Sequence, residues 1–174
     1  MNTRIVSIGA CAVLSAVVFA VSPGSAREII PFKGYSAGTI VIKTNERRLY
    51  YVTGAGEAIR YAVGVGKGGM AWAGKTTIDG KYIKPAWEAP ESIRKDYSKL
   101  PPVIPGSPAN PMGAAALTLS GGGQYAIHGT NNPGSVGGFV SHGCCMYNQD
   151  VMDLYGRVSW ALRSLSRGDR IQRL

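Results

Sequence analysis

Short stretches of β-branched and aromatic residues, separated by turns, recur along the chain after a mixed leader. The first three such stretches are 39–43, 47–52 and 58–65. Segments of this length and composition, bounded by Gly, Asn and Thr, are typical of β-strands. A further pair of strands is expected within 75–83, because Asp79-Gly80 is a favourable hairpin turn. The first half of the chain therefore predicts a series of short, locally paired strands.

The second half adds more strands and one helix. Strands are expected at 114–119, 124–127 and 170–174, and the proline-rich stretch 85–113 predicts a long loop. The helix is expected to begin at Asn148 as its N-cap and to continue through Val158 and on to Leu165. Its apolar face comprises Val151, Leu154, Tyr155 and Val158. These elements together predict a mainly β domain with one principal helix.

Residues 1–26 have the features of a secretory signal peptide. Arg4 is their only charged residue, a hydrophobic run covers 5–21, and Gly24 and Ala26 place small residues before Arg27. The alternatives are an uncleaved membrane anchor and lipidation of a cysteine within the segment. Cleavage before Arg27 is the preferred interpretation. It leaves a leader at 27–38 and a single domain at 39–174, in which no segment is apolar enough to span a membrane.

Composition and charge narrow the function classes. Of 174 residues, 45% are hydrophobic and 17% charged, which indicates a packed domain and excludes a disordered chain. The formal net charge of +9 suits an anionic partner. Nucleic acid is not expected, because the chain has no zinc-finger spacing, RNP-like motif or basic helix. The glycine-rich stretch 64–69 lacks a phosphate-loop pattern and is interpreted as a turn.

Cysteine and histidine are concentrated in one short part of the chain. The adjacent Cys144 and Cys145 cannot link distant segments, so no disulfide framework is expected. His128 and His142 lie nearby, but their spacing does not match a metal site. A thiol activated by an imidazole is the better interpretation, because a thiolate attacks carbonyl carbon well. His128 follows a strand, and Cys144 follows a glycine shortly before the helix.

From His128 to Cys144 the chain reads His-Gly-Thr-Asn-Asn-Pro-Gly-Ser-Val-Gly-Gly-Phe-Val-Ser-His-Gly-Cys. This string resembles the signature of the L,D-transpeptidase catalytic domain (the YkuD family), in which a histidine precedes Ser/Thr-x-Gly-Cys. The resemblance extends over nearly all of 35–158. It implies a β-sandwich-like domain that cleaves the bond between diaminopimelate and D-alanine in peptidoglycan stems.

The resemblance also implies roles for individual residues. Cys144 would form the thioester, and His128 would be the base that activates it. Supporting or oxyanion-binding roles would fall to Ser141, His142 and Gly143, with the N–H groups of Gly143 and Cys144 as donors. Substrate contacts are expected from Tyr125, Gly129 and Asn132.

The reaction so implied needs neither a cofactor nor a metal. An amine from a neighbouring stem would take the acyl group and give a 3–3 crosslink. Other acceptors in the family are an outer-membrane lipoprotein lysine, a free D-amino acid and water, and the sequence does not choose among them. The signal peptide and the resemblance together indicate the periplasm.

The chain departs from the family after Cys144. Family members usually continue with Ile/Val-Arg-Met/Leu, whereas Cys145 and Met146 follow here, so the arginine is missing. Three alternatives therefore remain open. Cys145 could be the nucleophile, the protein could be a weakened wall-binding or scaffolding protein, or it could be an L,D-carboxypeptidase-type hydrolase.

Overall fold

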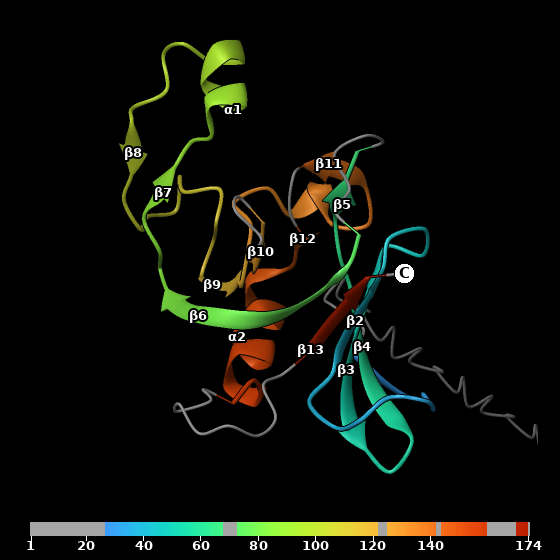
Figure 1. The fold of residues 1–174 in the computed structure, drawn as a ribbon. Helices are drawn as coiled ribbons and strands as arrows, with labels where there is room; N and C mark the ends of the chain where they lie inside the picture. The colour runs from blue at the N-terminus through green and yellow to red at the C-terminus, as the bar shows by residue number, and fades with distance from the viewer. Residues whose placement is uncertain (1–26, 68–72, 122–124, 142–143, 160–169, 174) are drawn as a thin grey trace, which may run out of the picture.

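The structure is a computed structural model that describes residues 27–67, 73–121, 125–141, 144–159 and 170–173 (Figure 1). The strands are β1 (Glu28–Pro31), β2 (Ile40–Lys43), β3 (Arg48–Gly54), β4 (Glu57–Ala62), β5 (Val65–Gly66), β6 (Lys75–Ile83), β7 (Trp87–Glu88), β8 (Val103–Ile104), β9 (Ala115–Leu119), β10 (Ala126–His128), β11 (Phe139–Ser141), β12 (Cys144–Cys145) and β13 (Arg170–Arg173). The helices are α1 (Glu91–Asp96), α2 (Asn148–Arg157) and the 3-10 turn η1 (Pro133–Ser135).

Most of the strands belong to one large sheet. Nine strands follow the order β1-β4-β3-β2-β13-β6-β9-β10-β12, and the short pairs β5–β11 and β7–β8 stand outside it. The long strand β6 connects the two halves of this sheet, because residues 75–77 pair with β13 and residues 78–83 pair with β9. In Figure 1, β2, β3 and β4 lie on one side of β6, and β9, β10 and β12 lie on the other. The predicted mainly β, sandwich-like fold is confirmed.

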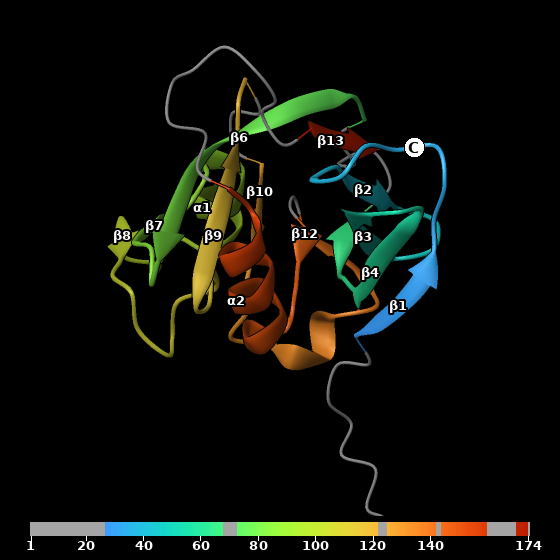
Figure 2. The same cartoon turned by 90° about the horizontal axis from the view of Figure 1, so that it is seen from below.

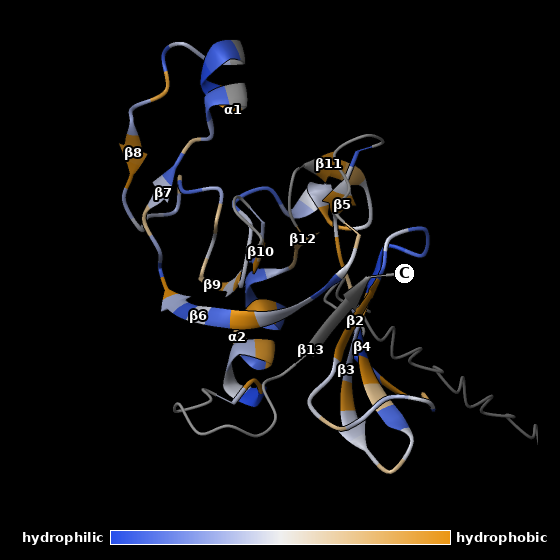
Figure 3. Cartoon of the chain, in the orientation of Figure 1, coloured by the Kyte–Doolittle hydropathy of each residue, from blue (hydrophilic) through white to orange (hydrophobic). Residues whose placement is uncertain are grey.

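The main core lies between the two halves and α2. It contains Ile40, Ile42, Leu49, Ile59, Tyr61, Val63, Val65, Ala115, Leu117, Leu119, Ile127, Cys144, Met146, Val151, Leu154 and Val158. Hydrophobic residues accordingly gather on β2, β3, β4 and one side of α2 (Figure 3). Figure 2 shows α2 alongside β9, against which it packs. A smaller cluster around Val41, Tyr50 and Val52 covers the opposite face of the first half.

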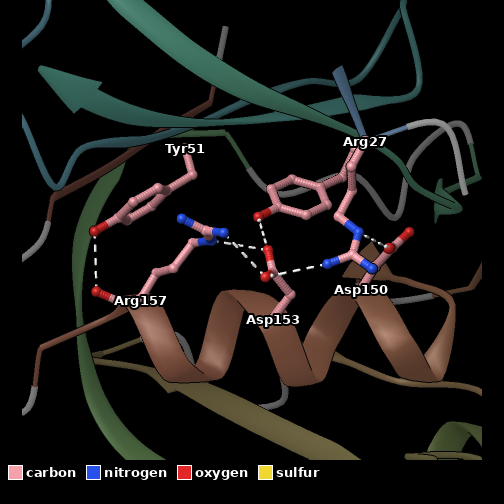
Figure 4. Close-up of polar contacts among 6 residues, drawn as sticks. Arg27, Tyr51, Asp150, Asp153 and Arg157 are labelled. Atoms are coloured by element: carbon pink, nitrogen blue, oxygen red, sulfur yellow. Dashed lines mark hydrogen bonds and ion pairs between the residues drawn. The ribbon is translucent and has the colours of Figure 1, made fainter. Parts of the chain in front are cut away.

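A charged cluster holds α2 against β4 and the start of the described chain. Asp153 accepts hydrogen bonds from the Tyr61 hydroxyl at 2.6 Å and from Nε of Arg157 at 2.8 Å. Arg27 lies 3.1 Å from Asp153 and 3.4 Å from the buried Asp150 (Figure 4). The Arg157 guanidinium and the Tyr61 hydroxyl hold the pKa of Asp153 below its ordinary value. This cluster fixes the helix that directly follows β12.

The predicted hairpin at Asp79-Gly80 is wrong, because β6 runs through both residues as one strand. A register shift between Ile78 and Gly80 leaves Asp79 without a partner on β9, as in a β-bulge. A Cβ on Gly80 would lie 2.4 Å from Oγ1 of Thr118 on β9, so the glycine allows close strand approach instead of a turn. Long-range pairing with β9 and β13 therefore overrides the local turn preference.

Other boundaries also differ from the predictions. The stretch 85–113 contains β7, α1 and β8, and β1 lies within the leader, where it pairs with β4. The cap of α2 is Tyr147, and Asn148 is the first helical residue. The predicted extension of this helix to Leu165 falls largely outside the described residues. Among the described residues, no helix is both long enough and apolar enough to cross a membrane.

Candidate active site

The site is built on two short neighbouring strands. β10 and β12 run parallel, with Ile127 opposite Cys144 and His128 opposite Cys145. Because successive side chains of a strand point to opposite faces, each register pair shares one face of the sheet. Ile127 and Cys144 therefore lie on one face, and His128 and Cys145 lie on the other.

The two faces have different surroundings. Cys144 and Ile127 are both 0% exposed and belong to the main core. Cys145 is 3% exposed, is not a member of that core cluster, and lines a pocket together with His128. Both thiols are free of disulfide bonds. The structure thus brings one thiol and one imidazole together in a single cavity.

The pocket has a volume of about 540 Å³, which is adequate for part of a peptide. It is lined by Lys67, Pro111, His128, Thr130, Asn132, Gly134, Ser135, Val140 and Cys145. Among the described residues of this lining, Lys67 is the only one that carries a full positive charge, and none carries a negative one. The pocket therefore favours an anionic or polar ligand.

Gly64 packs against Cys145 and is hydrogen-bonded to its backbone. The backbone N–H of Cys145 donates to the carbonyl of Gly64 at 3.0 Å, and the N–H of Gly64 donates to the carbonyl of Cys145 at 2.9 Å. A Cβ on Gly64 would lie 2.5 Å from Sγ of Cys145 and 2.6 Å from the carbonyl oxygen of Ser135. The thiol thus occupies the space that the absent side chain of Gly64 leaves open. Ser135 Oγ lies 3.5 Å from Sγ of Cys145 and donates to the Asn132 carbonyl.

The surroundings of His128 select its neutral form and its tautomer. Nδ1 lies 2.6 Å from the carbonyl oxygen of Gly129, which can only accept, so Nδ1 carries the proton. This leaves the Nε2 lone pair available as a base. Burial lowers the pKa of His128 below its ordinary value, and the carbonyls of Gly129 and Pro111 oppose this with smaller effects. The imidazole is therefore neutral at neutral pH.

Asn148 connects the loop that follows His128 to the start of α2 through hydrogen bonds. Its Oδ1 accepts from the N–H groups of Ala114 at 2.9 Å and Thr130 at 3.1 Å, and its Nδ2 donates to the Thr130 carbonyl at 3.0 Å. Cβ atoms on Gly113 or Gly129 would lie 2.2 Å or 2.3 Å from this Oδ1. The two glycines therefore allow the asparagine to reach both loops, which fixes the loop that follows His128.

The structure places the predicted site residues in different surroundings. His128 and Asn132 line the pocket, whereas Cys144 lies in the core and Tyr125 packs against it. Gly129 is buried and contributes its carbonyl to His128. Ser141 ends β11, where its backbone pairs with Gly66. His142 and Gly143 lie outside the described residues.

Sequence reasoning missed several residues in the pocket or next to it. Lys67 and Gly64 belong to the glycine-rich stretch interpreted as a turn, and Pro111 belongs to the proline-rich loop. Ser135 and Thr130 lie inside the string from His128 to Cys144, but no role was predicted for them. Within the described residues, no group of three His, Cys, Asp or Glu side chains could hold a metal ion.

The comparisons with known proteins agree on one family. The family model for the L,D-transpeptidase catalytic domain matches residues 37–171. The probable L,D-transpeptidase YbiS of Escherichia coli is 37% identical over 129 residues, which is 68% of this chain and 41% of the relative. The chain thus spans about two fifths of the length of this curated relative.

Solved structures share the fold. A protein of Brucella melitensis, named a probable carnitine operon oxidoreductase, is 35% identical with a TM-score of 0.57, over 84% of this chain and 96% of that one. The catalytic domain of an Enterococcus faecium L,D-transpeptidase is 11% identical with a TM-score of 0.57, over 82% of this chain and 100% of that one. The second similarity concerns the fold alone.

Proposed function

Because the chain belongs to the L,D-transpeptidase catalytic domain family, we propose that it is an exported cysteine acyltransferase of the cell wall. It cleaves the bond between diaminopimelate and D-alanine in peptidoglycan stems and transfers the acyl group to an amine, forming 3–3 crosslinks. The observation that carries this proposal is the pocket lined by both a cysteine and His128. A nucleophile and a base on adjacent strands suit acyl transfer.

The proposed reaction has two balanced halves. Nε2 of His128 removes the thiol proton while sulfur attacks the stem carbonyl carbon, and the tetrahedral intermediate then expels D-alanine. The leaving nitrogen receives the proton from the imidazolium, and a thioester remains. In the second half an acceptor amine attacks the thioester, loses a proton to His128, and releases the protonated thiol with a new amide.

The charge that develops on the carbonyl oxygen needs hydrogen-bond donors. On the basis of the sequence, the N–H group of Gly143 is the proposed donor, with Ser141 and His142 in support. The N–H of Cys145 is already bonded to the Gly64 carbonyl, so it is not available for this role. Substrate contacts are proposed for Asn132 in the pocket, and for Tyr125 and Gly129 beside it.

The proposed setting is the periplasm, reached through the signal peptide at 1–26. Support comes from the sequence of residues 1–26. Arg27, the first residue of the proposed mature chain, pairs with Asp150 and Asp153 and so belongs to the folded domain. The acyl acceptor is proposed to be the amine of a second stem, and a lipoprotein lysine is an alternative that uses the same thioester.

The proposed function is tested with the mature protein and purified disaccharide tetrapeptides. D-alanine release together with a product of the mass of a 3–3 dimer is the expected result. D-alanine release with tripeptide alone would instead identify a hydrolase. Binding to peptidoglycan with neither D-alanine release nor a covalent adduct after carbapenem exposure would leave a scaffolding role and contradict the proposal.

Lys67 is expected to bind a carboxylate of the stem, since it supplies the positive charge in the pocket lining. Replacing Lys67 by methionine should raise KM for the tetrapeptide about fivefold, with a smaller change in kcat, because a solvent-exposed ion pair contributes about 1 kcal/mol. Steady-state D-alanine release measures both constants. Lys99→Met removes the same charge from an exposed position outside the pocket lining and serves as the control. An equal rise in KM for both variants would show that only net charge matters.

A further inference from the structure

The proposed function requires one acylated thiol, and two adjacent cysteines are available. We infer that Cys145, and not Cys144, is the cysteine that carries the acyl group, while Cys144 is a residue of the hydrophobic core. This inference rests on the proposed acyl transfer and identifies the atom that performs it.

The first argument is the register of the two strands. Parallel pairing places Cys145 opposite His128 and Cys144 opposite Ile127. The side chain of Ile127 is fully buried in the core, so its face of the sheet is the core face. Cys144 shares that face, because paired positions of neighbouring strands point to the same side. The imidazole and the thiol of Cys145 share the other face.

The second argument is access to a substrate. Cys144 is 0% exposed among core residues, including Ile127 and Leu117, and it does not line the pocket. A stem carbonyl could reach it only if β12 turned over, which would bury the Cys145 side chain in its place. Cys145 borders a cavity of about 540 Å³ and needs no such rearrangement.

The third argument is that the surroundings of Cys145 position a thiol. Gly64 leaves space for Sγ, and two backbone hydrogen bonds between Gly64 and Cys145 fix the main chain. The Ser135 hydroxyl donates to the Asn132 carbonyl, so its oxygen is free to accept from the thiol at 3.5 Å. Acyl transfer requires a nucleophile that is held in place by rigid strands and by contacts with the surrounding residues.

The step assigned to Cys145 is balanced as follows. Its S–H proton passes to Nε2 of His128, a bond forms between Sγ and the stem carbonyl carbon, and the carbon–nitrogen bond to D-alanine breaks. D-alanine leaves with the proton from His128. The acceptor amine later restores the thiol of Cys145, so no oxidant or reductant is needed.

The first experiment reports which thiol faces the pocket, whether or not acyl transfer occurs. The native mature protein is treated with iodoacetamide, and the modified residue is located by fragment-ion mass spectrometry. Carbamidomethylation of Cys145 is expected, with Cys144 modified only after unfolding. Cys145→Ser should lower the native labelling rate at least about tenfold, because a core thiol reacts only when the structure opens. Native labelling at Cys144 in preference to Cys145 would overturn the inference.

The second experiment follows acylation by a carbapenem, using intact-mass spectrometry. Cys145→Ala should lower the rate of adduct formation by about 10³-fold or more, as loss of a nucleophile does. Cys144→Ala and the volume-conserving Cys144→Val should keep the rate within about threefold, since they alter only core packing. Thermal melts show that each variant is folded.

The outcomes separate the two proposals. If the unsubstituted protein is acylated, and both Cys144 variants lose the adduct while Cys145→Ala retains it, the assignment to Cys145 is wrong and the proposed function stands. If the unsubstituted, folded protein forms no adduct and releases no D-alanine, the proposed function fails, and the acyl step on Cys145 fails with it. The iodoacetamide labelling then still shows which thiol lines the pocket.

Discussion

Replacement of His128 by glutamine is expected to lower the rate of cysteine acylation by about 10²- to 10⁴-fold at neutral pH. Glutamine has a similar size and can still donate to the Gly129 carbonyl, which now accepts from Nδ1 of the imidazole. It cannot accept the thiol proton as a base, so the thiolate is no longer generated within the pocket. Single-turnover acylation by a carbapenem, followed by mass spectrometry, measures this loss directly.

The pH dependence gives a sharper signature of the same residue. The acylation rate of the unsubstituted protein should rise with pH as His128 loses its proton, since only the neutral imidazole is a base. Because burial lowers the pKa of His128, the midpoint should lie below the ordinary value of histidine. In the His128→Gln variant this acidic limb should be absent. The deficit should also shrink at alkaline pH, where hydroxide removes the thiol proton.

Stability provides the control for this variant. A histidine whose pKa is lowered by folding binds a proton more readily in the unfolded chain, so it destabilises the folded protein as pH falls below its ordinary pKa. The unsubstituted protein should therefore lose stability on acidification from neutral pH, and His128→Gln should lose less. Equal acylation rates for the two proteins at neutral pH would contradict the assigned role of His128.

The strands that could be predicted from the sequence carry their own local signal. β2, β3 and β9 each consist largely of β-branched or apolar residues between turn residues, and their positions agree with the predictions within a few residues. The Asp79-Gly80 turn could not be judged in this way, because its outcome depends on pairing with two strands far away in the sequence. Local preference decides a structure only where tertiary pairing does not oppose it.

The site shows the same division between local and long-range information. The two ends of the string from His128 to Cys144 lie on the adjacent strands β10 and β12, beside the pocket. The string could not place the two thiols, since a two-residue strand has no periodicity and its faces are defined only by β10 and the core beneath it. Gly64 is bonded to Cys145 and Lys67 lines the pocket, although both are far from Cys145 in the sequence and carry no local signal for these roles.

The second large effect, on both stability and acylation, is expected when a single methyl group is added at Gly64. Replacing Gly64 by alanine would place a Cβ 2.5 Å from Sγ of Cys145 and 2.6 Å from the Ser135 carbonyl oxygen, so the strand or the thiol must move. Overpacking of this kind costs about 1–3 kcal/mol, equivalent to a fall in Tm of about 3–10 °C for a domain of this size. A displacement of about 1 Å at a nucleophile can lower its rate about 10²-fold, which is the expected loss in acylation.

Two comparisons isolate the steric cause of the Gly64→Ala effect. Gly156→Ala introduces the same methyl group on α2, where the added Cβ has nothing within 4 Å apart from the helix's own nearby backbone, and it should leave acylation unchanged and raise Tm slightly. The double variant Gly64→Ala/Cys145→Ala removes Sγ and should be more stable than the sum of the two single changes predicts, because the residues are in contact. Strict additivity would show that the methyl group is not pressing on Cys145. The carbonyl of Ser135 would then be the source of the strain, and the acylation loss would have to arise from movement of the Ser135 loop.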